Sequence, residues 1–325
     1  MADSMLIVSP APHIRAGLDT PTIMRDVVIA LLPASVAAVH YFGWQAALSI
    51  VCSIAAAVAA EFILEKLTHR TVTIGDWSAV VTGLLIAMVL PPHVPVWVPI
   101  LAGFFGIGVV KVLFGGLGYN LFNPALMGRA FAVAAWSAMA TTGYVWPASA
   151  NGAIWARGFD AMSTATPLTL LKMGEIGATS ASKLYLPLFM GNAAGSLGET
   201  SALALLIGAV YLLWREEISL RIPMFYIATV AVITSLYGQD PLFHVLSGGL
   251  ILGAFFMATD YVTSPLNPKG QAIFGIGCGV LTALIRLFGG YPEGVAYSIL
   301  IMNAAVPLID RFARPRRFGE VKARA

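Results

Sequence analysis

Long apolar runs separated by short polar breaks dominate the sequence. A helix needs about 20 apolar residues to cross the roughly 30 Å hydrocarbon core of a bilayer. We predict ten membrane-spanning helices, at residues 27–44, 46–64, 77–92, 95–114, 124–146, 201–214, 222–238, 242–259, 272–288 and 294–310. Several runs have only 14–17 residues, so we expect tilted, kinked or broken helices. The pattern predicts an all-α integral membrane protein.

The composition supports a membrane protein. Of the 325 residues, 58% are hydrophobic and 11% are charged, whereas a soluble domain has roughly 25% charged residues. A net charge of +3, spread over scattered loops, argues against nucleic acid as a partner. The two cysteines are too few for a four-cysteine iron–sulfur cluster and have no metal-ligand spacing. We therefore predict a lipid-embedded chain with no metal site and no complete catalytic site of its own.

The basic residues predict the orientation in the membrane, because cytoplasmic loops are enriched in lysine and arginine. With the N-terminus in the cytoplasm, fifteen of the nineteen basic residues fall on or near the inner side. The four on the outer side are Arg157, Lys172, Lys183 and Arg286. We predict a bacterial inner-membrane protein with both termini cytoplasmic, which requires an even number of spans.

Three short segments recur in the same order, which indicates an internal repeat. They are Leu113–Gly116 with Leu287–Gly290, Gly83–Ile86 with Gly249–Leu252, and Asn123–Ala125 with Asn303–Ala305, at offsets of 174, 166 and 180 residues. Each half then holds five helices, and an odd number inverts the second copy relative to the first. Such repeats are typical of proteins with a site near the membrane midplane at the repeat interface.

The repeat divides the chain into three parts. Residues 1–146 form the first five-helix half, and residues 201–325 form the second half with a cytoplasmic tail. Residues 147–200 form a long polar loop between them, on the periplasmic side by the charge distribution. A long loop without regular structure is usually functional. We therefore look for chemistry in this loop first.

The loop contains the segment Asp160-Ala161-Met162-Ser163-Thr164-Ala165-Thr166-Pro167-Leu168. It resembles the flavin-attachment motif, Asp-x-x-Ser/Thr-Gly/Ala-Ala-Thr, of the RnfD proteins of Rnf complexes and their relatives in the sodium-pumping quinone reductase. The resemblance implies that a flavin transferase joins the phosphate of FMN to the Thr166 hydroxyl as a phosphoester. It also implies recognition through Asp160, Ser163, Thr164 and Ala165, with the trailing Pro167 and Leu168 as part of the match.

The residue types fit this chemistry. Small flanking side chains on an exposed loop let a transferase reach the hydroxyl, and a phosphoester replaces the basic phosphate cradle that is missing nearby. The alternative is an ordinary Ser/Thr-rich loop whose hydroxyls bond to the local backbone. A second segment, Gly177-Ala178-Thr179-Ser180, lacks the leading acid and the following Pro-Leu. Thr166 is therefore the predicted acceptor.

Further matches to the same family extend along nearly the whole chain. They include Thr22–Pro33, Gly115–Ala125, Gly195–Ser201 and Met257–Asp260. We therefore include Asn120, Asn123 and Arg129 among the predicted flavin contacts, with an anchoring role at the inner membrane surface as the alternative for Arg129. The chain departs from the family where Tyr261 follows Asp260, since proline is expected there.

The resemblance implies a redox subunit of an Rnf-type ferredoxin:NAD oxidoreductase, coupled to Na⁺ or H⁺ translocation. Implied partners are the other Rnf subunits, including a second flavin-bearing subunit and iron–sulfur subunits. A non-covalent riboflavin in this chain is also compatible with the family. Four acids near the predicted inner helix ends are either interfacial charges or guides for the coupling cation: Asp26, Glu61, Asp260 and Asp310.

A second class of protein shares the predicted architecture. Five-plus-five inverted repeats also resemble urea transporters, so a solute channel without flavin is the alternative, and the architecture cannot discriminate between them. The segment Asp160–Leu168 does discriminate, because a solute pore has no use for a flavin acceptor.

Overall fold

The computed structural model describes residues 19–142, 144, 146, 147, 165–175 and 182–313, and in these residues the regular structure is entirely helical. Four helices are long and apolar enough to cross a membrane: α1 (Thr20–Phe42), α2 (Trp44–Leu67), α14 (Pro268–Phe288) and α15 (Val295–Phe312). Shorter apolar helices are α3 (Ser78–Val89), α5 (Pro124–Ala135), α10 (Ala202–Trp214) and α11 (Arg221–Leu236). A further one consists of α4 (Trp97–Phe105) and the π-helical η2 (Gly106–Val112).

The predicted span 242–259 is broken. It consists of α12 (Pro241–Leu246), α13 (Leu250–Leu252) and the π-helical η5 (Gly253–Met257). The break falls at Gly248 and Gly249, whose φ angles of 69° and 67° are in the left-handed region that favours glycine. The predicted span 124–146 also divides, into α5 and α6 (Ser137–Thr142).

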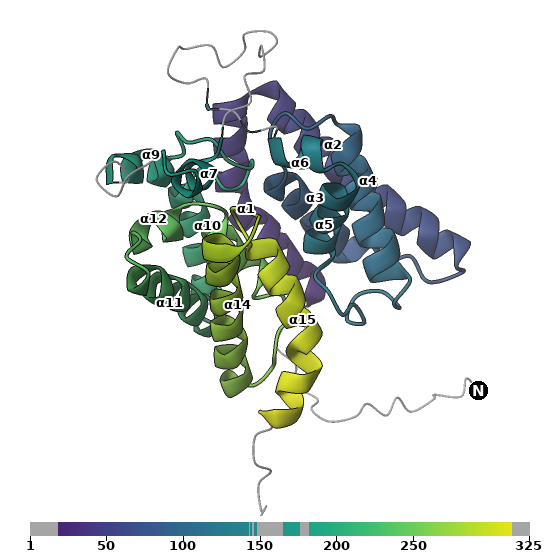
Figure 1. Ribbon diagram of the computed structural model, residues 1–325. Helices are drawn as coiled ribbons and strands as arrows, with labels where there is room; N and C mark the ends of the chain where they lie inside the picture. The colour runs from purple at the N-terminus through teal and green to yellow at the C-terminus, as the bar shows by residue number, and fades with distance from the viewer. Residues whose placement is uncertain (1–18, 143, 145, 148–164, 176–181, 314–325) are drawn as a thin grey trace, which may run out of the picture.

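Short helices occupy the connections. They are η1 (Ile74–Asp76), α7 (Pro167–Lys172), η4 (Ser182–Leu184) and α9 (Tyr185–Met190). The start of α1 and the end of α15 lie at one end of the helix bundle, and α7 and α9 lie at the opposite end (Figure 1). The first and the last described helix therefore begin and end, respectively, at the same end of the bundle.

The two halves of the chain lie side by side, and α1 packs against α10 between them (Figure 1). These two are the first helices of the predicted repeats. They approach closely because Gly208 has no side chain: a Cβ there would lie 1.9 Å from the carbonyl oxygen of Ala30. Small residues at such crossings are typical of helix packing in membranes.

The repeated asparagines contact each other across the two halves. With its amide oriented so that donors meet acceptors, Asn303 accepts a hydrogen bond from the Asn123 amide N–H at 3.1 Å. Asn123 also donates through its side chain to the carbonyl of Met257 at 3.4 Å. This contact joins the start of α5 in the first half to α15 in the second.

The interior and the exterior of the bundle are both apolar. A single large cluster of buried side chains, including Leu31, Ile86 and Phe274, joins both halves. Large apolar side chains such as Val36 and Leu236 are nonetheless exposed. A helix that is apolar all round suits a lipid environment, so the outer surface is of the kind a bilayer covers.

Candidate functional site

Thr166 lies at the start of α7. Its Oγ1 accepts a hydrogen bond from the backbone N–H of Thr169 at 3.3 Å, and Pro167 occupies the first helical turn. This is the ordinary geometry of a threonine N-cap followed by proline. The expectation of an exposed acceptor is wrong, since Thr166 is only 5% exposed. The hydroxyl is buried because the cap bond and the packing of α7 hold it there.

Helix α7 contacts the second half of the chain through residues near both of its ends. Leu168 packs against Gly248, where a Cβ would lie 2.2 Å from the leucine Cδ1. Lys172 donates a hydrogen bond to the carbonyl of Gly289 and another, at 3.4 Å, to that of Tyr291. The Pro-Leu that ends the motif therefore has a packing role, and α7 is positioned against the α14–α15 connection.

A cavity of about 320 Å³ lies between α5, α7 and the start of α15. The hydroxyl of Thr169, which lines it, is 2.8 Å from the hydroxyl of Thr166. Ligand pockets have volumes of roughly 300–1,000 Å³, so this cavity is large enough for a planar aromatic ligand. The remaining lining side chains are mainly aromatic, small or charged: Arg129, Thr141, Tyr144, Tyr291, Glu293 and Tyr297.

Arg129 joins the two halves electrostatically at this cavity. It projects from α5, its side chain is 12% exposed, and it forms an ion pair with Glu293 and another, at 3.8 Å, with Glu199. Tyr144 donates a hydrogen bond to the second oxygen of Glu293 at 3.1 Å. Buried charges need such partners. Arg129 therefore lies in the wall of the cavity and does not have the exposed position of an anchor at the membrane surface.

Arg286 is the second buried arginine near this cavity. Its guanidinium donates to four backbone carbonyls, those of His244, Ser247, Gly248 and Glu293. It therefore ties the break between α12 and α13 to the residues that precede α15. The sequence placed Arg286 among the outer basic residues, whereas the structure gives it an internal, organising position.

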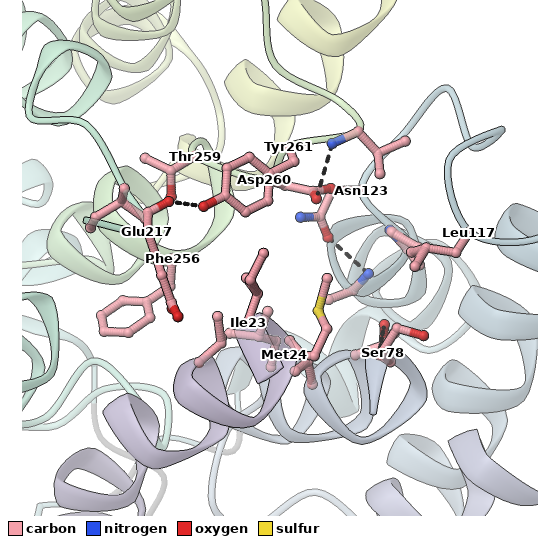
Figure 2. A pocket seen from close by; sticks show the side chains of 18 of the residues that line it. Ile23, Met24, Ser78, Leu117, Asn123, Glu217, Phe256, Thr259, Asp260 and Tyr261 are labelled. Carbon is pink, nitrogen blue, oxygen red and sulfur yellow. Dashed lines mark hydrogen bonds between the residues drawn. The ribbon is translucent and has the colours of Figure 1, made fainter. Parts of the chain in front are cut away.

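The two predicted asparagines lie at a different cavity, of about 80 Å³, near the start of α1. Ile23 and Met24 of α1 face Asp260 and Tyr261 of the second half across it (Figure 2). Both halves of the chain therefore contribute to this second cavity.

Asn120 and Asn123 differ in which of their side-chain amide atoms form hydrogen bonds. The Oδ1 of Asn123 caps α5 by accepting from Ala125 and Leu126, so both ends of that amide are used. Asn120 is buried and donates to the carbonyl of Phe122, but its Oδ1 accepts no hydrogen bond from the described residues. Of the two asparagines, Asn120 is thus the one with a free acceptor.

The structure separates the predicted flavin residues into two groups. Arg129 lines the larger cavity, and Thr166 lies one hydrogen bond from Thr169, which also lines it. Pro167 and Leu168 follow Thr166 in α7, and the half-buried Ala165 precedes it. Asn120 and Asn123 line the smaller cavity. The predicted recognition residues Asp160, Ser163 and Thr164 lie outside the described residues.

Sequence reasoning missed Thr169 and Glu293 as cavity residues, and Glu199 as a partner of Arg129. Glu293 had a detectable signal, since it is an isolated carboxylate beside an apolar run. Such a charge requires a partner.

The four acids near the inner helix ends have different surroundings. Glu61 is buried in an ion pair with Lys111, and Asp26 pairs with Arg215 at 2.7 Å. Asp260 caps its own turn by accepting from the hydroxyl of Thr263 at 3.0 Å. Asp310 has one buried oxygen without a partner. The first three are therefore paired or hydrogen-bonded, and none of the four is a simple surface charge.

The fold and the cavities define a multi-pass helical membrane protein with a polar, partly aromatic cavity between two packed halves. The chain belongs to the NQR2, RnfD, RnfE family, which it matches over residues 7–319.

Its relatives carry names of ion-translocating redox complexes. It is 49% identical to the D subunit of the Na⁺-translocating ferredoxin:NAD⁺ oxidoreductase complex of Acetobacterium woodii, over 99% of this chain and 98% of the relative. It is 44% identical to the D subunit of the proton-translocating ferredoxin:NAD⁺ oxidoreductase complex of Clostridium ljungdahlii, over 97% of both chains. The D subunit of the ion-translocating oxidoreductase complex of Halorhodospira halophila is 38% identical, over 96% of this chain and 95% of the relative.

Proposed function

We propose that this chain is the D subunit of an Rnf-type ferredoxin:NAD⁺ oxidoreductase and relays electrons through FMN attached to Thr166. The observation that carries the proposal is the position of Thr166. The predicted acceptor hydroxyl lies one hydrogen bond, 2.8 Å, from a residue that lines a 320 Å³ cavity. A phosphate bonded to Thr166 therefore leaves room for the rest of the cofactor beside it.

The cavity residues suit a flavin in shape and charge. Tyr291 and Tyr297 present two aromatic rings, with centroids 5.2 Å apart, at its wall. Arg129 provides a positive charge at the cavity and is held there by ion pairs with Glu199 and Glu293. When bound, FMN supplies one- or two-electron chemistry. The protein's part is to bind the ring, to orient it through α7 and to stabilise negative charge near Arg129.

Fluorescence of the denatured protein tests this proposal. A phosphoester survives denaturation, so chain produced with a flavin transferase should give a fluorescent band in a denaturing gel under ultraviolet light. Chain produced without the transferase should stay dark. The alternative function, a urea-transporter-like solute channel without flavin, predicts a dark band in both cases.

The smaller cavity has a hydrogen-bond acceptor suited to a second flavin, but its volume is smaller than a flavin ring needs. The unpartnered Oδ1 of Asn120 matches the N3–H donor of a flavin ring. The cavity of 80 Å³ is far below the roughly 300 Å³ of common ligand pockets. We propose that a non-covalent riboflavin binds here after displacement of flexible lining side chains such as Met24 and Leu117.

Extraction of free flavin checks the second proposal. Acid treatment of purified protein should release riboflavin, and Asn120→Leu should lower the amount released while the covalent flavin stays. Thr169→Val, a change at the other cavity, serves as the control and should leave the released riboflavin unchanged. Release that is equal from the Asn120→Leu protein would place the second flavin elsewhere.

We further propose the finer topology that the sequence predicts. Two inverted five-helix repeats, arranged as in urea transporters, would place both termini in the cytoplasm and α7 near the periplasmic face. The contact between Asn123 and Asn303 and the pairing of α1 with α10 support this arrangement. The chain would then work with a second flavin-bearing subunit and iron–sulfur subunits. The relatives' names include both Na⁺ and proton translocation, and the coupling ion is either of these.

A further inference from the structure

Glu217 is a buried carboxylate that the flavin sites do not use. It lies in the connection between α10 and α11, outside the membrane-spanning helices, and is only 4% exposed. Neither of its carboxyl oxygens accepts a hydrogen bond from a protein donor within the described part of the chain. Burying an ionised carboxylate without a hydrogen-bond donor has a high free-energy cost unless a cation or a proton neutralises it.

The charged groups that face Glu217 are Asp26 on α1 and Arg215 at the end of α10. Arg215 is committed to Asp26: its Nη2 lies 2.7 Å from the Asp26 Oδ2, and its Nε donates to the same oxygen at 2.9 Å. Tyr211 donates to the other Asp26 oxygen at 3.0 Å. Arg215 thus neutralises Asp26, and an ionised Glu217 beside this pair would add one negative charge that no ion pair within the described residues compensates.

We propose that Glu217, together with Asp26, binds a small monovalent cation, with Na⁺ and a proton as exclusive alternatives. Na⁺ entry releases the carboxyl proton of Glu217 to solvent, so the charge of the pair is unchanged by the exchange. Because Arg215 is committed to Asp26, one such positive charge at Glu217 makes the group of two carboxylates and one arginine neutral. The site is separate from both flavin proposals and does not depend on them.

The surroundings of Glu217 favour a hard cation. It lines the 80 Å³ cavity (Figure 2). It also lines a third cavity, of about 230 Å³. The other polar side chains that line the 230 Å³ cavity all carry oxygen atoms: Glu216, Ser219, Thr259, Tyr261, Ser264 and Gln271. Hard cations take oxygen ligands. Since a water occupies about 30 Å³, the cavity can also hold several waters of a hydrated ion.

The protonation of Glu217 sets the competition between the two cations. Burial, and after it the neighbouring Asp26 carboxyl, raises the pKa of Glu217 to about 8. The carboxyl group therefore carries a proton at neutral pH when Na⁺ is absent. Because one proton competes with one Na⁺, the Na⁺ concentration for half-saturation should rise about tenfold for each pH unit below this pKa.

Infrared difference spectroscopy of the full chain in membranes tests the site. Replacing K⁺ by Na⁺ at pH 7 should remove a C=O stretch of a protonated carboxyl group, and the half-saturating Na⁺ concentration should be about tenfold higher at pH 6. Glu217→Gln should abolish the difference band. Glu175→Gln, the same change at an exposed carboxylate on the α7 side of the chain, should retain it.

Three outcomes would overturn the proposal: no difference between Na⁺ and K⁺, a Na⁺ response independent of pH, or a band that survives Glu217→Gln. Loss of the band in Glu175→Gln would instead indicate a general surface-charge effect and would equally contradict it. If Glu217→Gln fails to fold, the pH dependence of the wild-type response decides alone. The measurement is repeated in the Thr166→Asn protein, so that a failure here is separate from any failure of the flavin proposal.

Discussion

Thr166→Asn should abolish the covalent flavin while leaving the protein folded. Asparagine has no hydroxyl and cannot form the phosphoester, but it caps helices at least as well as threonine. The start of α7 should therefore be preserved. Fluorescence of the denatured band should vanish, and electron transfer through the assembled complex should fall to near background because the relay lacks one step.

Asparagine is chosen over alanine at position 166 because Thr166 is buried and caps α7. Thr166→Ala also removes the hydroxyl, but it deletes the N-cap bond to Thr169, and loss of a cap costs about 0.5–2 kcal/mol. Thr164→Ala and Thr179→Ala are the controls and should keep the bound flavin. A fluorescent band from Thr166→Asn would move the acceptor to another residue.

Arg129→Met should be among the most destabilising single changes in the chain. It leaves Glu199 and Glu293 as buried carboxylates without their cation, and breaking a buried ion pair in this way costs about 3–5 kcal/mol. Thermal unfolding of the detergent-solubilised protein measures the effect. Lys183→Met, which removes an exposed positive charge, should change the unfolding free energy by less than about 0.5 kcal/mol.

A double variant separates charge from packing. Arg129→Met with Glu293→Gln removes one of the two orphaned charges, and it should recover part of the lost stability. Equal stability of the single and double variants would mean that Arg129 acts through its packing alone, contrary to a role in neutralising Glu293.

Much of the helical pattern could be predicted from hydrophobicity. The boundaries of Ala202–Trp214 and Arg221–Leu236 fall within two residues of the predicted spans. The break at Gly248 and Gly249 could not be placed, since an apolar run shows where a helix is possible but not where its backbone leaves the helix. Positive φ at both glycines is held by tertiary contacts, among them those of Leu168 and Arg286.

The motif around Thr166 could be found from the sequence, but its surroundings could not. Thr169, Glu199 and Glu293 come together only through folding, from segments up to 124 residues apart, and no local pattern records their proximity. The sequence grouped Asn120 with Arg129 because both follow one family signature. The structure divides them because the start of α5 and its middle open to different cavities.

The mass of the peptide that contains Thr166 tests the central claim most directly. Chain produced with the flavin transferase is digested, and the peptides are separated and sequenced by fragmentation. The account predicts that the peptide carries the mass of one FMN less one water, with the addition assigned to Thr166. An unmodified Thr166 peptide from transferase-treated protein, or an FMN addition on any other residue, would contradict it.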